Sequence, residues 1–390
     1  MISGDIRFEW EFLNEKNRGE RMRGKGAQKS LQWFNGERIP DQQFDVEFNL
    51  MFDYRGQCTW AVAHLEFDNN AGLDQSPFGC SGRFREGTDP ATGIYGSTNS
   101  DGDPSGCHGS GTCENLCLRK AYFGWNIFEE CNSRLDIEVG RRHLYDVFES
   151  RVQFRSRMDG ALLRYSNCFE CVGDFYVNLG AWVVDENANH WAWGVEVGLL
   201  DIADYGIDVK YSFVDWTKDS TNRCNVSDPV GFQFQVSQFY LAYNFNPELL
   251  CTSARIYTAF LINHDAEKRS YLNNKKENLG WYIGFSVGEV CCEGDWWFDI
   301  NYQYVEAEAI PDWDLTGIGR GNVRGIPLTQ NARFGWTNYQ GFRAEALYAI
   351  TDNLALNPSF ELSSEARKDV TTPITKTEYT KVELQVIYAF

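Results

Sequence analysis

Apolar and polar residues alternate along most of this chain, which is the pattern of β-strands with one apolar face. In the last ten residues, Lys381 to Phe390, every second side chain from Val382 onward is apolar, and Ile387 alone breaks the pattern. Successive side chains of a strand point to opposite faces, so this segment has an apolar side and a polar side. The same alternation recurs from Asp5 to Leu13 and from Phe44 to Tyr54. Each of these segments predicts a strand with one face in an apolar environment.

About sixteen such strands can be placed along the chain. Short connections alternate with mostly longer ones, so one rim of the assembly carries turns and the other carries loops, with long loops expected at 14–42, 68–114 and 308–339. An even number of antiparallel strands with these connections favours a closed barrel, because closure leaves no edge unpaired. The predicted strands span residues 5–13, 44–54, 58–67, 116–128, 135–140, 159–166, 174–184, 191–200, 205–216, 231–245, 252–262, 279–287, 295–305, 341–350, 353–362 and 378–390.

The amount of aromatic surface indicates what surrounds these strands. Aromatic residues make up 15% of the 390 residues. No window approaches the ~18 consecutive apolar residues of a membrane helix, but a barrel strand crosses with about 9 to 11 residues, of which every second faces lipid. A soluble sandwich or propeller, the alternative, would have to cover the apolar stripes with a second layer. We therefore expect an all-β fold, a single closed antiparallel transmembrane β-barrel over residues 1–390.

Charge and motifs exclude several classes of function. The formal net charge of −19 argues against a nucleic-acid partner, because phosphate binding needs a basic surface. The five histidines are scattered without metal-binding spacing. No nucleophile motif, phosphate-binding loop or dinucleotide fingerprint is present. We predict no metal, no cofactor and no catalytic residue, so the protein is not expected to be an enzyme.

Several short motifs resemble bacterial outer-membrane porins of the putative-porin and alginate-export type. Residues 296–362 are also similar to the last hairpins of the putative-porin group. The cysteine content resembles instead the disulfide-linked envelope proteins of chlamydia-like bacteria. The motifs are the closing alternation that ends on Phe390, the strand Leu135 to Gly140 that runs into Arg141 and Arg142, and the strand start from Met158 to Ala161.

The resemblance implies a location and a function. It implies a passive diffusion channel for ions and small hydrophilic solutes, surrounded by outer-membrane lipid and assembled as a homotrimer. Tyr388 and Phe390 would be the signal that the barrel-assembly machinery reads. The chain opens at Met1 directly into a strand, which indicates a mature start from which the export signal has been removed.

The polar strand faces place charged side chains inside the barrel, where water can hydrate them. In porins generally the third external loop folds inward and narrows the pore, and the segment 143–157 corresponds to it here. A plain surface loop is the alternative for this segment. The expected constriction residues are Asp146, Glu149, Arg151, Arg155 and Arg157, and the expected pore-lining residues are Lys120, Arg142, Lys210, Arg255, Arg343 and Glu345.

Twelve cysteines are many for a cytosolic chain and do not match a zinc module, which favours an oxidising compartment. Cysteines on neighbouring turns can be bridged if their Cα atoms come within ~7 Å. Intramolecular bridges are favoured, and covalent links to periplasmic envelope proteins are the alternative. The candidates are Cys131, Cys168, Cys171, Cys251, Cys291 and Cys292 at short turns, and Cys80, Cys107, Cys113 and Cys117 at or near longer loops.

Two further functions stay open at this point. The cysteines could crosslink the cell envelope, which would make the chain a structural protein. The alginate-export resemblance suggests a channel specific for a substrate such as an acidic polysaccharide. That channel predicts a continuous ladder of arginine and lysine through the lumen, and the acidic excess of the inward positions speaks against it.

Overall fold

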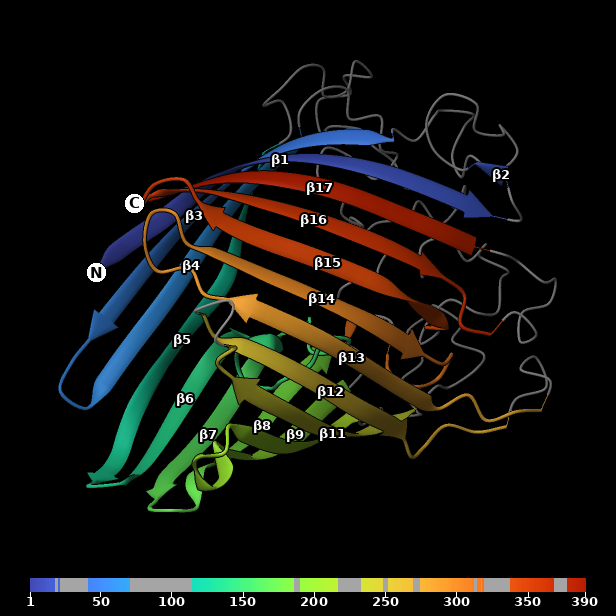
Figure 1. The fold of residues 1–390 in the computed structure, drawn as a ribbon. Coiled ribbons are helices and arrows are strands. Elements are labelled where there is room, and N and C mark those ends of the chain that lie inside the picture. The colour runs from blue at the N-terminus through green and yellow to red at the C-terminus, as the bar shows by residue number, and fades with distance from the viewer. Residues whose placement is uncertain are drawn as a thin grey trace, which may run out of the picture.

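A computed structural model of the chain forms a closed antiparallel β-barrel (Figure 1). It describes residues 1–17, 20–21, 41–70, 114–185, 190–216, 233–247, 252–268, 274–311, 314–316, 318, 337–367 and 377–390. One sheet contains 17 strands, and β2 has only 2 residues, so sixteen long strands form the wall. None of the helices in these ranges is long and apolar enough to span a membrane.

The strands follow one another around the barrel in chain order. They are β1 (Ile2–Asn17), β2 (Glu20–Arg21), β3 (Gln42–Arg55), β4 (Thr59–Asn70), β5 (Glu114–Glu130), β6 (Ser133–His143), β7 (Arg157–Phe169), β8 (Gly173–Asp185), β9 (His190–Leu200), β10 (Ile207–Trp216), β11 (Phe234–Phe245), β12 (Ala254–Asn263), β13 (Leu279–Gly288), β14 (Trp296–Val305), β15 (Tyr339–Ala349), β16 (Leu354–Ser364) and β17 (Thr377–Ala389). Two short 3-10 helices are η2 (Leu144–Asp146) and η3 (Ile202–Asp204).

The last strand closes the barrel against the first. Val386 of β17 lies opposite Phe8 of β1. At the end of this seam, the N–H of Gly4 donates to the carbonyl of Phe390 at 3.1 Å, and the N–H of Phe390 donates to the carbonyl of Gly4 at 3.0 Å. The two termini therefore lie close together (Figure 1). The predicted pairing of the last strand with the first is confirmed, and so is the closed barrel of sixteen strands.

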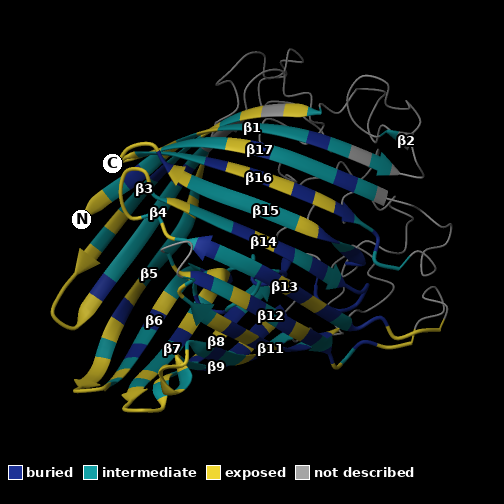
Figure 2. Ribbon diagram, in the orientation of Figure 1, coloured by how far each residue is buried: buried dark blue, intermediate teal, exposed yellow. Residues whose placement is uncertain are grey.

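The two faces of the wall differ in polarity, as the alternation predicts. In β9, Trp191 and Trp193 are 51% and 45% exposed. Ala192, which lies between them, and Glu196, further along the strand, are buried. Buried and exposed positions alternate along many of the strands (Figure 2). The outer face is thus apolar and the inner face largely polar. An apolar outer surface of this extent requires an apolar environment such as lipid.

The connections observed at one end of the barrel are short, and we name this end the short-turn rim. Gly173 (φ 127°) and Gly288 (φ 89°) adopt backbone conformations there that favour glycine. Several strands extend beyond their predicted bounds. The one predicted at 135–140 runs from Ser133 to His143, because its last residues still pair with β7. Most of the predicted loops 14–42, 68–114 and 308–339 lies outside the described residues.

Part of the barrel interior holds an apolar core that the strand pattern did not predict. Inward-facing aromatic residues of β8 to β15 contribute to it, including Trp182, Tyr240 and Tyr282. Two connecting segments complete it. One comprises residues 144–156, between β6 and β7, and we name it the inward segment. The other comprises the described residues of 306–318, after β14, and we name it the second segment. The open lumen is therefore narrower than the wall alone would leave.

Candidate channel constriction

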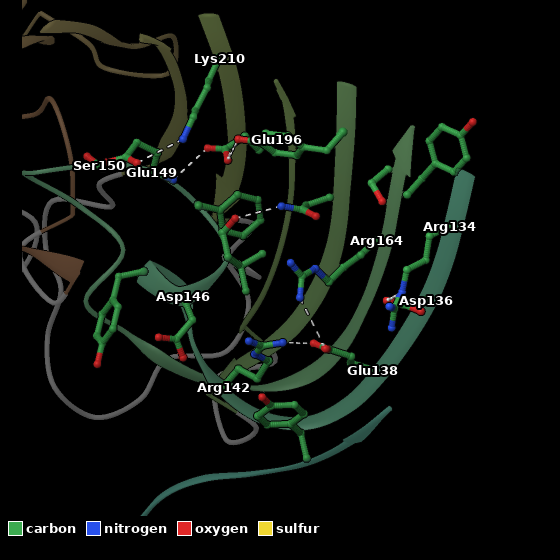
Figure 3. Close-up of a pocket in the computed structure, with 18 of the residues that line it drawn as sticks. Arg134, Asp136, Glu138, Arg142, Asp146, Glu149, Ser150, Arg164, Glu196 and Lys210 are labelled. Atoms are coloured by element: carbon green, nitrogen blue, oxygen red, sulfur yellow. Dashed lines mark hydrogen bonds and ion pairs between the residues drawn. The ribbon is translucent and has the colours of Figure 1, made fainter. Parts of the chain in front are cut away.

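The inward segment lies across the inside of the barrel. Glu196 of β9 accepts a hydrogen bond from the N–H of Glu149 at 2.9 Å. On β14, the side-chain amide of Gln303 donates to the carbonyl of Arg151 at 3.2 Å. Figure 3 shows Glu149 and Ser150 of the segment beside Glu196 and Lys210 of the wall. Because these partners are inward-facing side chains, the segment is anchored within the lumen.

Three charged side chains of the inward segment form ion pairs with the wall. The pairs are Asp146 with Lys120 at 2.8 Å, Glu149 with Lys210 at 3.2 Å and Arg151 with Asp299 at 3.3 Å. The guanidinium of Arg151 also lies 5.0 Å from the ring centroid of Tyr257, a cation–π contact. Burial acts to raise the pKa of the Glu149 carboxyl, but Lys210, Arg151 and Arg255 lower it below its ordinary value. Glu149 is therefore ionised at neutral pH.

Apolar side chains fix the other side of the inward segment. The ring centroids of Phe148 and Phe154 lie 5.1 Å apart. The ring of Phe148 also makes an edge contact with Trp182 of β8, with 5.5 Å between the centroids. Val152 and Phe154 are completely buried. Apolar and charged residues are interspersed between 147 and 155, so the segment packs one side on the core and presents charges on the other.

An open cavity of about 830 Å³ lies between the inward segment and the inner faces of β3 to β10 (Figure 3). Glu138, 3% exposed, pairs with Arg142, and Arg164 approaches it to 3.7 Å. Arg142 also stacks over Tyr122, 4.3 Å from the ring centroid. The cavity is thus polar and carries fixed charges of both signs. Its charged lining residues are Arg55, Arg134, Asp136, Glu138, Arg142, Asp146, Glu149, Arg151, Arg164, Glu196 and Lys210.

The wall formed by β15, β16, β17, β1 and β3 is strongly acidic. Lys381 pairs with Glu11 at 3.4 Å and also with Glu383. Carboxylate oxygens of Glu9, Glu11 and Asp45 lie within 4.8 Å of one another, and the nearby Lys381 offsets part of their charge. The inner face of this wall carries Asp5, Glu9, Glu11, Asp45, Glu47, Asp53, Glu345, Glu361 and Glu383 against Arg7, Arg55, Arg343 and Lys381.

Comparison with known proteins identifies the fold. No protein-family model and no curated protein matches the chain. Among solved structures, OprB of Pseudomonas putida in its high-pH form is similar, with 11% identity, a TM-score of 0.52, and coverage of 100% of this chain and 94% of that chain. The fold is that of the outer-membrane porins. OmpF of Salmonella typhi, solved with daunomycin, matches with 12% identity and a TM-score of 0.51, covering 100% of this chain and 97% of that chain.

The porin barrel brings most of the predicted pore residues together on two sides of the lumen. Their roles in conduction are taken up as a proposal below. Arg142, Asp146, Glu149, Arg151 and Lys210 line the cavity, with Lys120 bound to Asp146. Arg343 and Glu345 pair at 2.9 Å on the acidic wall, and Arg255 pairs with Asp208 of β10 at 3.2 Å. Arg155 donates its backbone N–H to the carbonyl of Asp314, and Arg157 is the first residue of β7.

Sequence reasoning missed the second segment. Residues 308–339 were expected to form an external loop, but the described residues Ile310, Asp314 and Leu315 are buried inside the porin barrel. One sequence signal could have found them. Ala307 and Ala309 continue the period-two alternation beyond the end of β14, and such small apolar residues fit a narrow interior.

The predicted disulfides do not occur among the described residues. Neighbouring turns do touch, since the N–H of Cys168 donates to the carbonyl of Asn132 at 3.0 Å. Cys131 (φ 23°) and Cys171 (φ 64°) occupy turn positions and have exposed side chains. Cys58, Cys131, Cys168, Cys171, Cys291 and Cys292 are exposed free thiols. Cys117 lies in β5, and Cys80, Cys107, Cys113 and Cys251 lie outside the described residues.

Proposed function

We propose that this protein is a passive diffusion channel of the outer membrane for ions and small hydrophilic solutes. The observation that carries the proposal is the polar cavity of about 830 Å³ inside a barrel with an apolar outer surface. Hydrated solutes can cross such a space without a catalytic step, because fixed charges and hydrogen-bonding groups replace part of their hydration. The porin fold supports the same conclusion.

The inward segment is proposed to be the constriction. Its ion pairs with Lys210 and Asp299 hold it at a fixed position across the lumen. Solutes would then pass through the cavity between the charged side of the segment and the inner faces of β3 to β10, within a lumen whose remaining wall, β15 to β3, is acidic. Fixed charges facing each other across a narrow aqueous gap create a transverse field, which favours small polar solutes over apolar ones.

The charge balance favours cations. The cavity lining carries nearly equal numbers of acidic and basic groups, whereas the wall of β15 to β3 carries nine carboxylates and four basic groups in the described strands. An acidic lining raises the local cation concentration. We therefore propose a weakly cation-selective channel.

Liposome swelling tests the size limit that the constriction implies. Protein refolded into vesicles should admit neutral sugars at rates that fall steeply as the sugar grows. Ser166→Trp adds bulk to a residue of the cavity lining and should slow the larger sugars most. Ala161→Trp places the same side chain on an exposed position of the same strand and serves as the control. Equal rates for all sugars and all variants would rule out passage through this cavity.

A second function is favoured by the distribution of the cysteines. Six exposed free thiols, including the adjacent Cys291 and Cys292, lie on or next to turns of the short-turn rim. Thiols on one exposed rim can exchange with disulfides of envelope proteins, forming a mixed disulfide and releasing a thiol of the partner, so the chain could also act as a crosslinked structural protein. Such a protein should run as high-mass species on non-reducing gels of cell envelopes. A channel without this role should migrate as a monomer whether or not thiol is added.

A channel specific for an acidic polysaccharide is less favoured. The arginines of β6 and β7 that face the cavity are neutralised by neighbouring carboxylates. Arg142 and Arg164 meet Glu138, and Arg134 pairs with Asp136 at 2.8 Å. A polyanion would therefore find no continuous row of uncompensated positive charge here.

Assembly partners are proposed from the same resemblance. Phe390 ends the chain beside β3, with its ring 6.1 Å from that of Phe48, and Tyr388 is 51% exposed on the outer face. These aromatic residues would be read by the barrel-assembly machinery. A homotrimer in outer-membrane lipid is proposed for the mature protein. Deletion of Phe390 should reduce outer-membrane insertion, and crosslinking of intact membranes should yield trimers.

A further inference from the structure

The carboxylate of Asp314 in the second segment accepts hydrogen bonds from the inward segment. Asp314 accepts the N–H of Phe154 on Oδ2 at 2.8 Å and the N–H of Ser156 on Oδ1 at 2.9 Å. Its own carbonyl accepts the N–H of Arg155 at 3.2 Å. Beside it, the N–H of Thr316 donates to a carbonyl of the inward segment at 3.0 Å. Four hydrogen bonds therefore join two segments that are distant in sequence.

The environment of Asp314 is unusual for a carboxylate. The residue is completely buried, and no ion pair reaches it from any described residue. A buried charge without a counter-charge is costly unless hydrogen bonds compensate it. Backbone N–H groups of the inward segment supply those bonds here. If the inward segment moved away, the carboxylate would lose these donors.

The conformation of the inward segment also depends on this contact. Phe154 has φ 76°, a region that bulky residues avoid. Such a conformation persists only where the surroundings fix it, and the bond from its N–H to Asp314 is one fixed point. The burial of the Phe154 ring in the apolar core is the other.

We propose that Asp314 is a positioning residue that latches the inward segment across the lumen, and that opening this latch changes the width of the channel. The inference rests on the proposed channel function, because it assigns the stability of the constriction to a residue of a different connection. Asp314 itself does not line the cavity, so it acts through the backbone of residues 154–156.

Acidity should strengthen the latch. Burial raises the pKa of Asp314 to about 6, although hydrogen bonds from Ser156 and Phe154 act to lower it. If release of the inward segment lets water reach Asp314, its carboxyl returns to its ordinary pKa of about 3.9, because lost burial outweighs lost donors. The latched state therefore binds the proton more tightly, is favoured most below pH ~4, and loses this advantage as the pH rises through about 6. Two pKa units correspond to roughly a 100-fold change in the latched-to-released ratio.

Other charged groups on the elements around Asp314 bear on this dependence. They are Glu149, Arg151 and Arg155 of the inward segment, Arg157 of β7, Asp299 of β14, and Glu306 and Glu308 of the second segment. The pKa of Glu149 lies below its ordinary value, so this carboxylate does not titrate near pH 6. Glu196 of β9 also accepts an N–H of the inward segment, so the loss of the pH effect in Asp314→Asn, and not its midpoint alone, assigns the effect to Asp314.

Single-channel recording of the refolded full chain at pH 5 and pH 8 tests the proposal. For the wild type, we expect transitions between conductance levels to be at least about tenfold more frequent at pH 8. Asp314→Asn carries no charge at either pH and should lose this dependence. Asp314→Ala removes the acceptor and should fluctuate at both. Asp295→Asn is the control, because Asp295 also accepts two backbone N–H groups, at a turn far from the inward segment.

Limited trypsin digestion gives a readout that does not depend on conduction. Arg151 and Arg155 should be cleaved at least about tenfold faster in Asp314→Ala than in the wild type and in Asp295→Asn, as mass spectrometry of the fragments can show. Unchanged cleavage together with an unchanged pH profile in Asp314→Asn would overturn the latch. A folded wild type without any conductance would overturn the channel function instead. If Asp314→Ala does not fold, the pH dependence of the wild type and of Asp314→Asn still tests the latch.

Discussion

Leu384 in the closing strand is the position where the lipid-facing side of the barrel can be tested most sharply. It is 38% exposed on the outer face and pairs with Trp10 of β1 and Pro358 of β16. Its chain neighbour Gln385 points inward and donates to Glu9 at 2.8 Å and to Glu383 at 3.0 Å. An arginine at these two adjacent positions should therefore meet opposite environments.

The depth of Leu384 follows from the register. It lies five residues before Ala389, the last paired residue of β17. At ~3.4 Å per residue and a tilt of ~45°, this places it about 12 Å from the rim, near the middle of an apolar band ~25 Å tall. Leu384→Arg should then cost ~2 to 4 kcal/mol of folding free energy in a bilayer. Val386→Arg, two residues nearer the rim, should cost less.

Gln385→Arg should change stability by less than about 1 kcal/mol, because the lumen is polar and two carboxylates lie within reach. Guanidinium unfolding of vesicle-reconstituted protein, followed by tryptophan fluorescence and by unheated gels, measures both variants. A cost for Gln385→Arg that equals or exceeds that of Leu384→Arg would show that the two faces are assigned the wrong way round.

Three further outcomes are expected. Glu138→Gln removes the carboxylate that Arg164 approaches and should shift the reversal potential toward anions in a salt-gradient bilayer measurement. Gly140→Ala should destabilise the barrel by roughly 1 to 3 kcal/mol in the vesicle unfolding assay, because its φ of 132° suits only glycine. The Glu149 carboxyl has a lowered pKa, so its tie to Lys210 should persist as the pH falls through ~4.5 and weaken only below that value. Single-channel conductance recorded from pH 7 to pH 4 should accordingly show no step assignable to Glu149.

The wall could be predicted from the sequence because its pattern is local. Period-two alternation marks each strand in the sequence. Closure of a barrel pairs the last strand with the first, and Val386 does lie opposite Phe8. Strand ends were less predictable. The strand at Leu135 runs three residues beyond Gly140, since pairing with β7 continues where the apolar alternation has already stopped.

The interior could be predicted only in part, because it depends on contacts between distant segments. The charges of the inward segment were visible in the sequence, but their partners Lys210 and Asp299 come from strands far along the chain. Asp314 gave no sequence signal at all. Its role arises from a segment that folds back beside Phe154, 160 residues away. The predicted disulfides are not present between the described turns. Sequence spacing alone cannot show how a turn residue orients its side chain.

The most direct test of the channel is the reversal potential of purified protein in a planar bilayer that separates unequal concentrations of potassium chloride. The acidic wall and the charge-balanced cavity predict discrete conductance steps and a reversal potential of the sign produced by cation preference. Heat-unfolded protein should give no steps. Correctly folded protein that inserts into the bilayer without any conductance would contradict the account, and a clear anion preference would contradict its assignment of the acidic wall to the permeation path.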